Sequence, residues 1–220
     1  MYCSSWRGIT HKWAARYLLP VLTIVILTQC HSAPAVLSSL LLVGAGWLTF
    51  AASARLHTTI WHKVECEQQA AKLDVGVISF LIAWGGAPTV IVLIGGAYGW
   101  LVFVGGTLLA FCTAGMTAFD RWPDSHVIRF DVAIFVLQGI TTFVPVLLEC
   151  LPSGRSTSLE AWCWSGATLF YIGGAAILAF KFPDPSHNHF GYHELWHAAI
   201  ILAFSCQFHA NLSVVVRNGQ

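Results

Sequence analysis

Long apolar runs alternate with short polar stretches along most of this chain. A transmembrane helix requires about 20 predominantly apolar residues at a rise of about 1.5 Å per residue. Seven such helices are predicted, at residues 14–30, 35–56, 73–94, 97–116, 127–149, 161–180 and 195–216. The polar stretches between them are too short to hold a soluble domain. We therefore expect an all-α membrane protein in which residues 1–220 form one seven-transmembrane helix bundle.

The composition supports this interpretation. The chain is 56% hydrophobic and only 10% charged, whereas about 25% of the residues of a typical soluble domain are charged. The net charge of +1 and the lack of a basic run give no basis for nucleic-acid binding. The expected partners are the lipid bilayer and a lipid substrate or ligand. The protein is expected to be a multi-pass integral protein of the plasma membrane or an internal membrane.

The first 35 residues have two interpretations. Basic residues at positions 7, 12 and 16 precede a short apolar run and the small-residue sequence Ser32–Ala35, a pattern that resembles a cleavable signal peptide. The alternative, which we favour, is a retained first transmembrane helix. Both interpretations give the same topology for the remaining helices.

The Lys and Arg residues predict the orientation of the bundle, because cytoplasmic loops are enriched in these residues. Nine of the eleven fall on one side of the predicted membrane: Arg7, Lys12, Arg16, Arg55, Lys63, Lys72, Arg121, Arg129 and Lys181. Only Arg155 and Arg217 fall on the other side. The N-terminus is therefore predicted to be cytoplasmic and the C-terminus to lie outside.

Polar residues gather at the cytoplasmic ends of three predicted spans. They are Ser53 and His57 in the second, Asp74 at the start of the third, and His193 and His197 at the start of the last. Ionisable residues are costly within a membrane and usually mark a functional site there. The shared depth of these residues predicts that they form one site.

The histidine spacing indicates a metal site. His193 and His197 are four residues apart, so their rings share one helix face and can bind one zinc ion. The alternative is a pair of interfacial histidines near the loop residues His187 and His189. Because His57 is predicted at the same depth, we favour zinc held by three histidines, with the open fourth position typical of catalytic zinc.

The other two polar residues have catalytic and structural interpretations. Asp74 could accept a hydrogen bond or a proton from a metal-bound water, or it could be a helix N-cap or an interfacial charge. Ser53 could orient a ligand or the water, or it could be a small residue that packs two helices together.

The segment His193–His197 also matches the H-E-x-x-H motif of metalloproteases, with Glu194 as general base. This motif is short and occurs by chance. A peptidase of that type has no need of Ser53, His57 or Asp74, so we keep it as a minor alternative.

The dispersed pattern Ser53-x-x-x-His57, Asp74 and His193-x-x-x-His197 resembles the hemolysin III and progestin and adipoQ receptor (PAQR) family. The segments Phe190–His197 and Tyr171–Ala175 are especially similar to the hemolysin III branch. The resemblance covers roughly residues 35–215.

This resemblance implies a heptahelical protein with zinc bound by His57, His193 and His197, with Asp74 binding the metal's water and Ser53 supporting the site. Receptor members of the family resemble alkaline ceramidases, which implies hydrolysis of a lipid amide. A receptor or lipid sensor with structural zinc, and a pore-forming haemolysin, are the alternatives. One departure concerns the third span, where residues 84–88 lack the hydroxyls of a Gly-Thr-Tyr-Thr-Pro-like stretch, so a shared substrate contact is not expected there.

Overall fold

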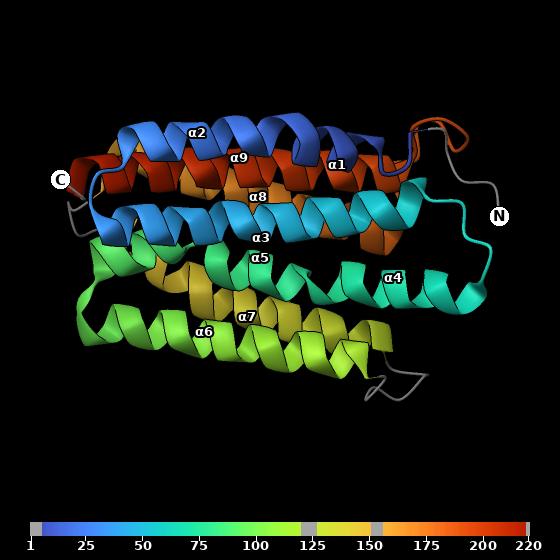
Figure 1. The fold of residues 1–220 in the computed structure, drawn as a ribbon, viewed down its shortest axis with the longest axis horizontal. Coiled ribbons are helices and arrows are strands. Elements are labelled where there is room, and N and C mark those ends of the chain that lie inside the picture. Colours follow the sequence, from blue (N-terminus) through green and yellow to red (C-terminus); the bar gives the residue numbers. More distant parts are fainter. Residues whose placement is uncertain (1–5, 120–126, 151–155, 219–220) are drawn as a thin grey trace.

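The computed structural model describes residues 6–119, 127–150 and 156–218, without the side chains of 127–133 and 149–150. Within these residues every regular element is helical, and the helices run alongside one another as an elongated bundle with the two termini at opposite ends (Figure 1). In chain order the elements are α1 (Ile9–Trp13), η1 (Ala14–Leu18), α2 (Leu19–Gln29), α3 (Ala33–Thr58), α4 (Val64–Gly76), α5 (Ile78–Gly85), η2 (Thr89–Ile94), α6 (Gly96–Ala118), α7 (Val127–Cys150), α8 (Ser158–Phe180) and α9 (Tyr192–Asn218).

Among the described residues, five helical segments are long and apolar enough to cross a membrane: Ala33–Thr58, Val64–Ile94, Gly96–Ala118, Ser158–Phe180 and Tyr192–Asn218. A shorter apolar stretch, Ile134–Leu148, lies within α7. The structure is therefore that of an all-helical, multi-pass integral membrane protein.

Helices cover all of the predicted spans, but the third begins earlier than expected. The sequence predicted a start at residue 73, whereas α4 begins at Val64. The added segment contains Glu65, Glu67 and Lys72, which are good helix formers but are not apolar. The hydrophobic pattern therefore predicted only the apolar part of the segment Val64–Ile94. Asp74, which was predicted at the start of the helix, lies in the last turn of α4.

The third helical segment is interrupted after α5, which ends at Gly85, and Gly86, Ala87 and Pro88 separate α5 from η2. The side chain of Asn211 in α9 compensates for the interruption. It donates a hydrogen bond to the Gly85 carbonyl at 2.8 Å and accepts one from the Thr89 backbone N–H at 3.0 Å. Such side-chain partners are what make a broken helix tolerable at membrane depth.

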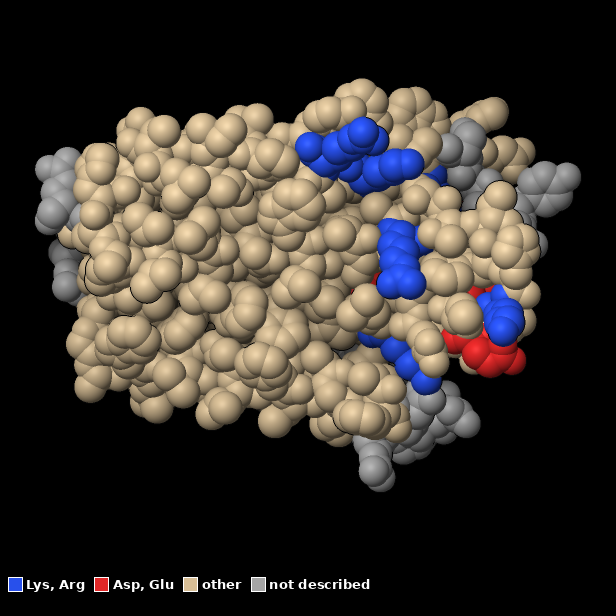
Figure 2. Space-filling model, in the orientation of Figure 1, with Lys and Arg blue, Asp and Glu red and all other residues tan. Residues whose placement is uncertain are grey.

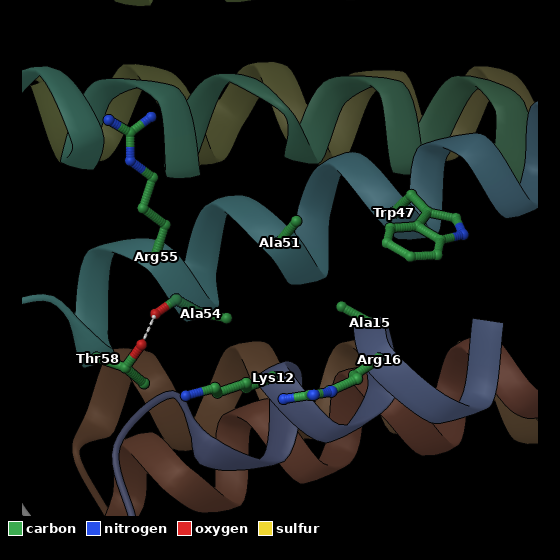
Figure 3. A pocket seen from close by; sticks show the side chains of 8 residues that line it. All are labelled: Lys12, Ala15, Arg16, Trp47, Ala51, Ala54, Arg55 and Thr58. Atoms are coloured by element: carbon green, nitrogen blue, oxygen red, sulfur yellow. Dashed lines mark hydrogen bonds between the residues drawn. The ribbon is translucent and has the colours of Figure 1, made fainter. Parts of the chain in front are cut away.

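The N-terminal segment α1–η1–α2 is an integral part of the core. Leu19 and Ile26 are fully buried and belong to the same apolar cluster as Phe50 and Phe204. Ala15 lies on the side of η1 nearest α3 (Figure 3). Small residues at a helix contact allow backbones to approach closely, and the N-terminal segment packs directly against α3.

Basic side chains gather at one end of the bundle. On the face shown in Figure 2, Lys and Arg lie towards the end that carries the N-terminus. Arg217 is at the opposite end, where it donates to Glu160 at 2.9 Å. Arg121 and Arg155 are outside the described residues, as is the side chain of Arg129. The described basic residues are therefore as unevenly distributed as the sequence predicted.

Candidate metal centre

The three predicted ligands come from two helices that lie far apart in the sequence. His57 is in the last turn of α3, and His193 and His197 are in the first two turns of α9. Because α3 packs against α9, the C-terminal end of one helix lies beside the N-terminal end of the other. The structure thus brings the three imidazoles together, with one ligand atom of each lying within 4.8 Å of the others.

The spacing of these nitrogens fits a tetrahedral metal ion. His57 Nε2 and His193 Nε2 are 3.3 Å apart. Two nitrogens bound to one zinc at about 2.0–2.1 Å and a tetrahedral angle would be about 3.3–3.4 Å apart. The ring centroids of His57 and His193 lie 5.2 Å and 4.6 Å from that of His197, and one nitrogen of each of the three rings lies within 4.8 Å of the others. The donor set therefore fits zinc.

Asp74 and Ser53 join this group from α4 and α3. The Asp74 Oδ2 atom is 3.8 Å from His57 Nε2, the same nitrogen that faces His193. The carboxylate thus lies on the side of His57 where a metal would bind. Ser53 Oγ is 3.5 Å from His197 Nε2, and Ser53 is also a side-chain hydrogen-bond partner of Asp74. The arrangement places one carboxylate and one hydroxyl beside the three imidazoles.

Glu194 has a different environment from its neighbours in the sequence. Its fully buried side chain accepts a hydrogen bond from the Gly191 backbone N–H at 2.8 Å, and Arg7 donates to it at 3.3 Å. A carboxylate held in this way stabilises the start of α9 and ties it to the N-terminal segment. This geometry disfavours the peptidase interpretation, which requires Glu194 to act on a water at the metal.

The loop before α9 is also fixed by a carboxylate. Asp184 Oδ1 accepts the backbone N–H of Tyr192 at 3.0 Å, and Oδ2 lies 2.9 Å from the His187 ring. The hydrogen bond to His187 lowers the pKa of Asp184. Together with Glu194, this residue sets the position at which α9 begins and hence the placement of His193.

The structure adds a histidine that the sequence analysis did not single out. His11 in α1 is 3% exposed, and its ring stacks on that of His197 with centroids 4.0 Å apart and planes at 22°. The sequence offered one indication of its role, namely its position. His11 stands just before the first apolar run, as Asp74 and His193 stand at the starts of the third and last runs. Arg7, which contacts Glu194, enters the sequence analysis only as a basic residue of the N-terminal segment and as an orientation signal.

Residues 4–208 match the haemolysin-III related family. The match includes all of the predicted site residues, and it begins well before residue 35, the approximate start of the sequence resemblance. It therefore includes α1 and the histidine that stacks on His197. The chain belongs to the haemolysin-III related family.

Proposed function

We propose that the protein is a single seven-transmembrane domain spanning residues 1–220, with a cytoplasmic N-terminus and an external C-terminus. The segment Ile9–Gln29 and α7 would be the two spans beyond the five long apolar ones. The uneven distribution of Lys and Arg supports the orientation. In this topology the three histidines lie near the cytoplasmic face.

We propose further that the protein is a zinc-dependent hydrolase of lipid amides such as ceramide. The observation that carries this proposal is the convergence of His57, His193 and His197, with Asp74 beside the nitrogen of His57 that would bind the metal. Three protein ligands and an adjacent carboxylate are the donor set of a hydrolytic zinc site. The location at the end of a membrane bundle suits a substrate that lies in the bilayer.

Each residue has a definite role in this chemistry. Zinc would polarise the amide carbonyl and lower the pKa of a bound water to about 7. The three imidazoles would hold the ion, and Asp74 would accept a proton from the attacking water. The Ser53 hydroxyl, between His197 and Asp74, would keep both groups oriented.

Elemental analysis of the purified protein, together with a ceramide assay, tests the proposal. The wild-type protein should contain one zinc ion and release fatty acid from ceramide, and a chelator should stop the release. His197→Ala should lose both the zinc and the activity. Wild-type protein that binds zinc but turns over no lipid amide would rule out the hydrolase.

The burial of the centre favours a second candidate, a heptahelical receptor or lipid sensor with structural zinc. His197 is 2% exposed and is covered by His11, and structural zinc sites are closed whereas catalytic ones keep an open position. In this case His57→Ala should lower thermal stability, while Asp74→Ala should leave both stability and signalling unchanged. A hydrolase should instead lose its activity in Asp74→Ala.

A further inference from the structure

His11 is buried in a column of rings that ends at the metal centre. One side of its ring stacks on His197, and Phe50 packs on it with centroids 4.9 Å apart. Phe50 in turn makes an edge contact with Phe204 in the apolar core. The imidazole of His11 therefore lies where the apolar core meets the candidate metal ligands.

The ring nitrogens of His11 lack partners in the described part of the chain. Neither Nδ1 nor Nε2 makes a hydrogen bond there, and the backbone of His197 approaches the ring without completing one. Burial of a polar group without a hydrogen bond is unfavourable. A phenylalanine could occupy the same stack without this penalty, so stacking alone does not account for a histidine at this position.

The segment that carries His11 is held against the centre at two further points. Gly8 has a φ of 76°, and a Cβ atom at this position would lie 2.6 Å from the Cβ of His57. Only glycine allows this approach without strain. Arg7 contacts Glu194 at the start of α9. Contacts to both helices that carry the ligands fix the position of His11 relative to the three histidines.

We infer that His11 is a ligand-binding residue of the metal centre. One ring nitrogen donates a hydrogen bond to the water, or to the oxygen of a polar lipid head group, at the coordination position that the three histidines leave open. The ring face meanwhile holds His197 in place. The inference rests on the proposed zinc site. It adds to that site a polar contact from His11 in α1.

Anion binding to the cobalt(II)-substituted protein tests this role without relying on turnover. Azide binds at an open coordination position of cobalt and changes its visible absorption, and it can accept a hydrogen bond. His11→Phe keeps the stack and should retain cobalt, but it should bind azide about tenfold more weakly, the equivalent of about 1.4 kcal/mol. His11→Gln, which retains an N–H donor, should recover part of the affinity.

Leu19→Ala is the matched control, since Leu19 is fully buried on the same N-terminal segment and belongs to the apolar core cluster. It should lower thermal stability but leave the azide affinity unchanged. Equal azide affinity in wild type and His11→Phe would overturn the role of His11 and leave the zinc site standing. A wild-type protein that takes up no cobalt would overturn the zinc site and this inference together. A wild-type protein that binds cobalt but not azide would overturn this inference and favour structural zinc.

Discussion

Replacement of Glu194 by Gln separates a structural carboxylate from a catalytic one. The side chain is buried and accepts hydrogen bonds from the Gly191 N–H and from Arg7. Gln preserves the shape and one accepting oxygen but removes the negative charge. We therefore expect Glu194→Gln to fold and to keep its zinc, but with lower stability.

The size of the effect follows from these two contacts. A hydrogen bond to a charged group contributes about 1.5–3 kcal/mol. The bond from Gly191 is short and buried, and Gln can retain it in a weaker form. Arg7 is 24% exposed at its side chain, so solvent screens part of its contribution. The expected loss is about 1–3 kcal/mol in the free energy of unfolding, with about 2–4 °C of melting temperature for each kcal/mol.

Thermal unfolding in detergent measures the expected loss of stability, and zinc analysis checks that the metal is retained. Glu67→Gln is the control, because Glu67 is an exposed glutamate in the first turn of α4, and a surface change of this kind should stay within about 0.5 kcal/mol. Suppose instead that Glu194→Gln melts like the wild type, keeps its zinc and loses hydrolytic activity. Glu194 would then be the general base, and the structural role assigned here would be wrong.

Three further variants test other parts of the structure. Asp74→Asn should keep its zinc but lose hydrolysis by about 10²–10⁴-fold, the usual contribution of a general base; loss of zinc in this variant would make Asp74 a ligand instead. Gly8→Ala should lower the melting temperature, since the left-handed conformation costs a residue with a side chain about 1–2 kcal/mol. The added methyl group would also press on His57, and this should weaken zinc binding in a chelator competition. Wild-type zinc affinity in this variant would show that the contact with His57 is easily relieved. Asn211→Leu should destabilise the protein by about 1–2 kcal/mol, because interhelical hydrogen bonds in membranes have about this strength and the Gly85 carbonyl would lose its partner; an unchanged unfolding curve would mean that another group replaces the amide.

The helices of this protein could be predicted from the sequence because the constraint on them is local. Within a bilayer the backbone must satisfy its own hydrogen bonds, so each long apolar run must be helical. The same argument does not reach polar helical residues, and the predicted start of the third helix was therefore too late. Hydropathy also gave no information on how the interruption near Gly85 is accommodated, because its partner Asn211 comes from α9.

The sequence alone identified the residue types of the candidate site and the end of the bundle at which they lie, since ionisable groups are rare near a membrane interior and each one could be assigned a depth. Only the tertiary structure decided which of them meet. The pairing of α3 with α9 sets the 3.3 Å separation of His57 and His193, and packing of the N-terminal segment brings His11 onto His197. It also brings Arg7 to within 3.3 Å of the Glu194 carboxylate. These contacts join residues more than a hundred positions apart, and no local pattern specifies which helix faces will pack together.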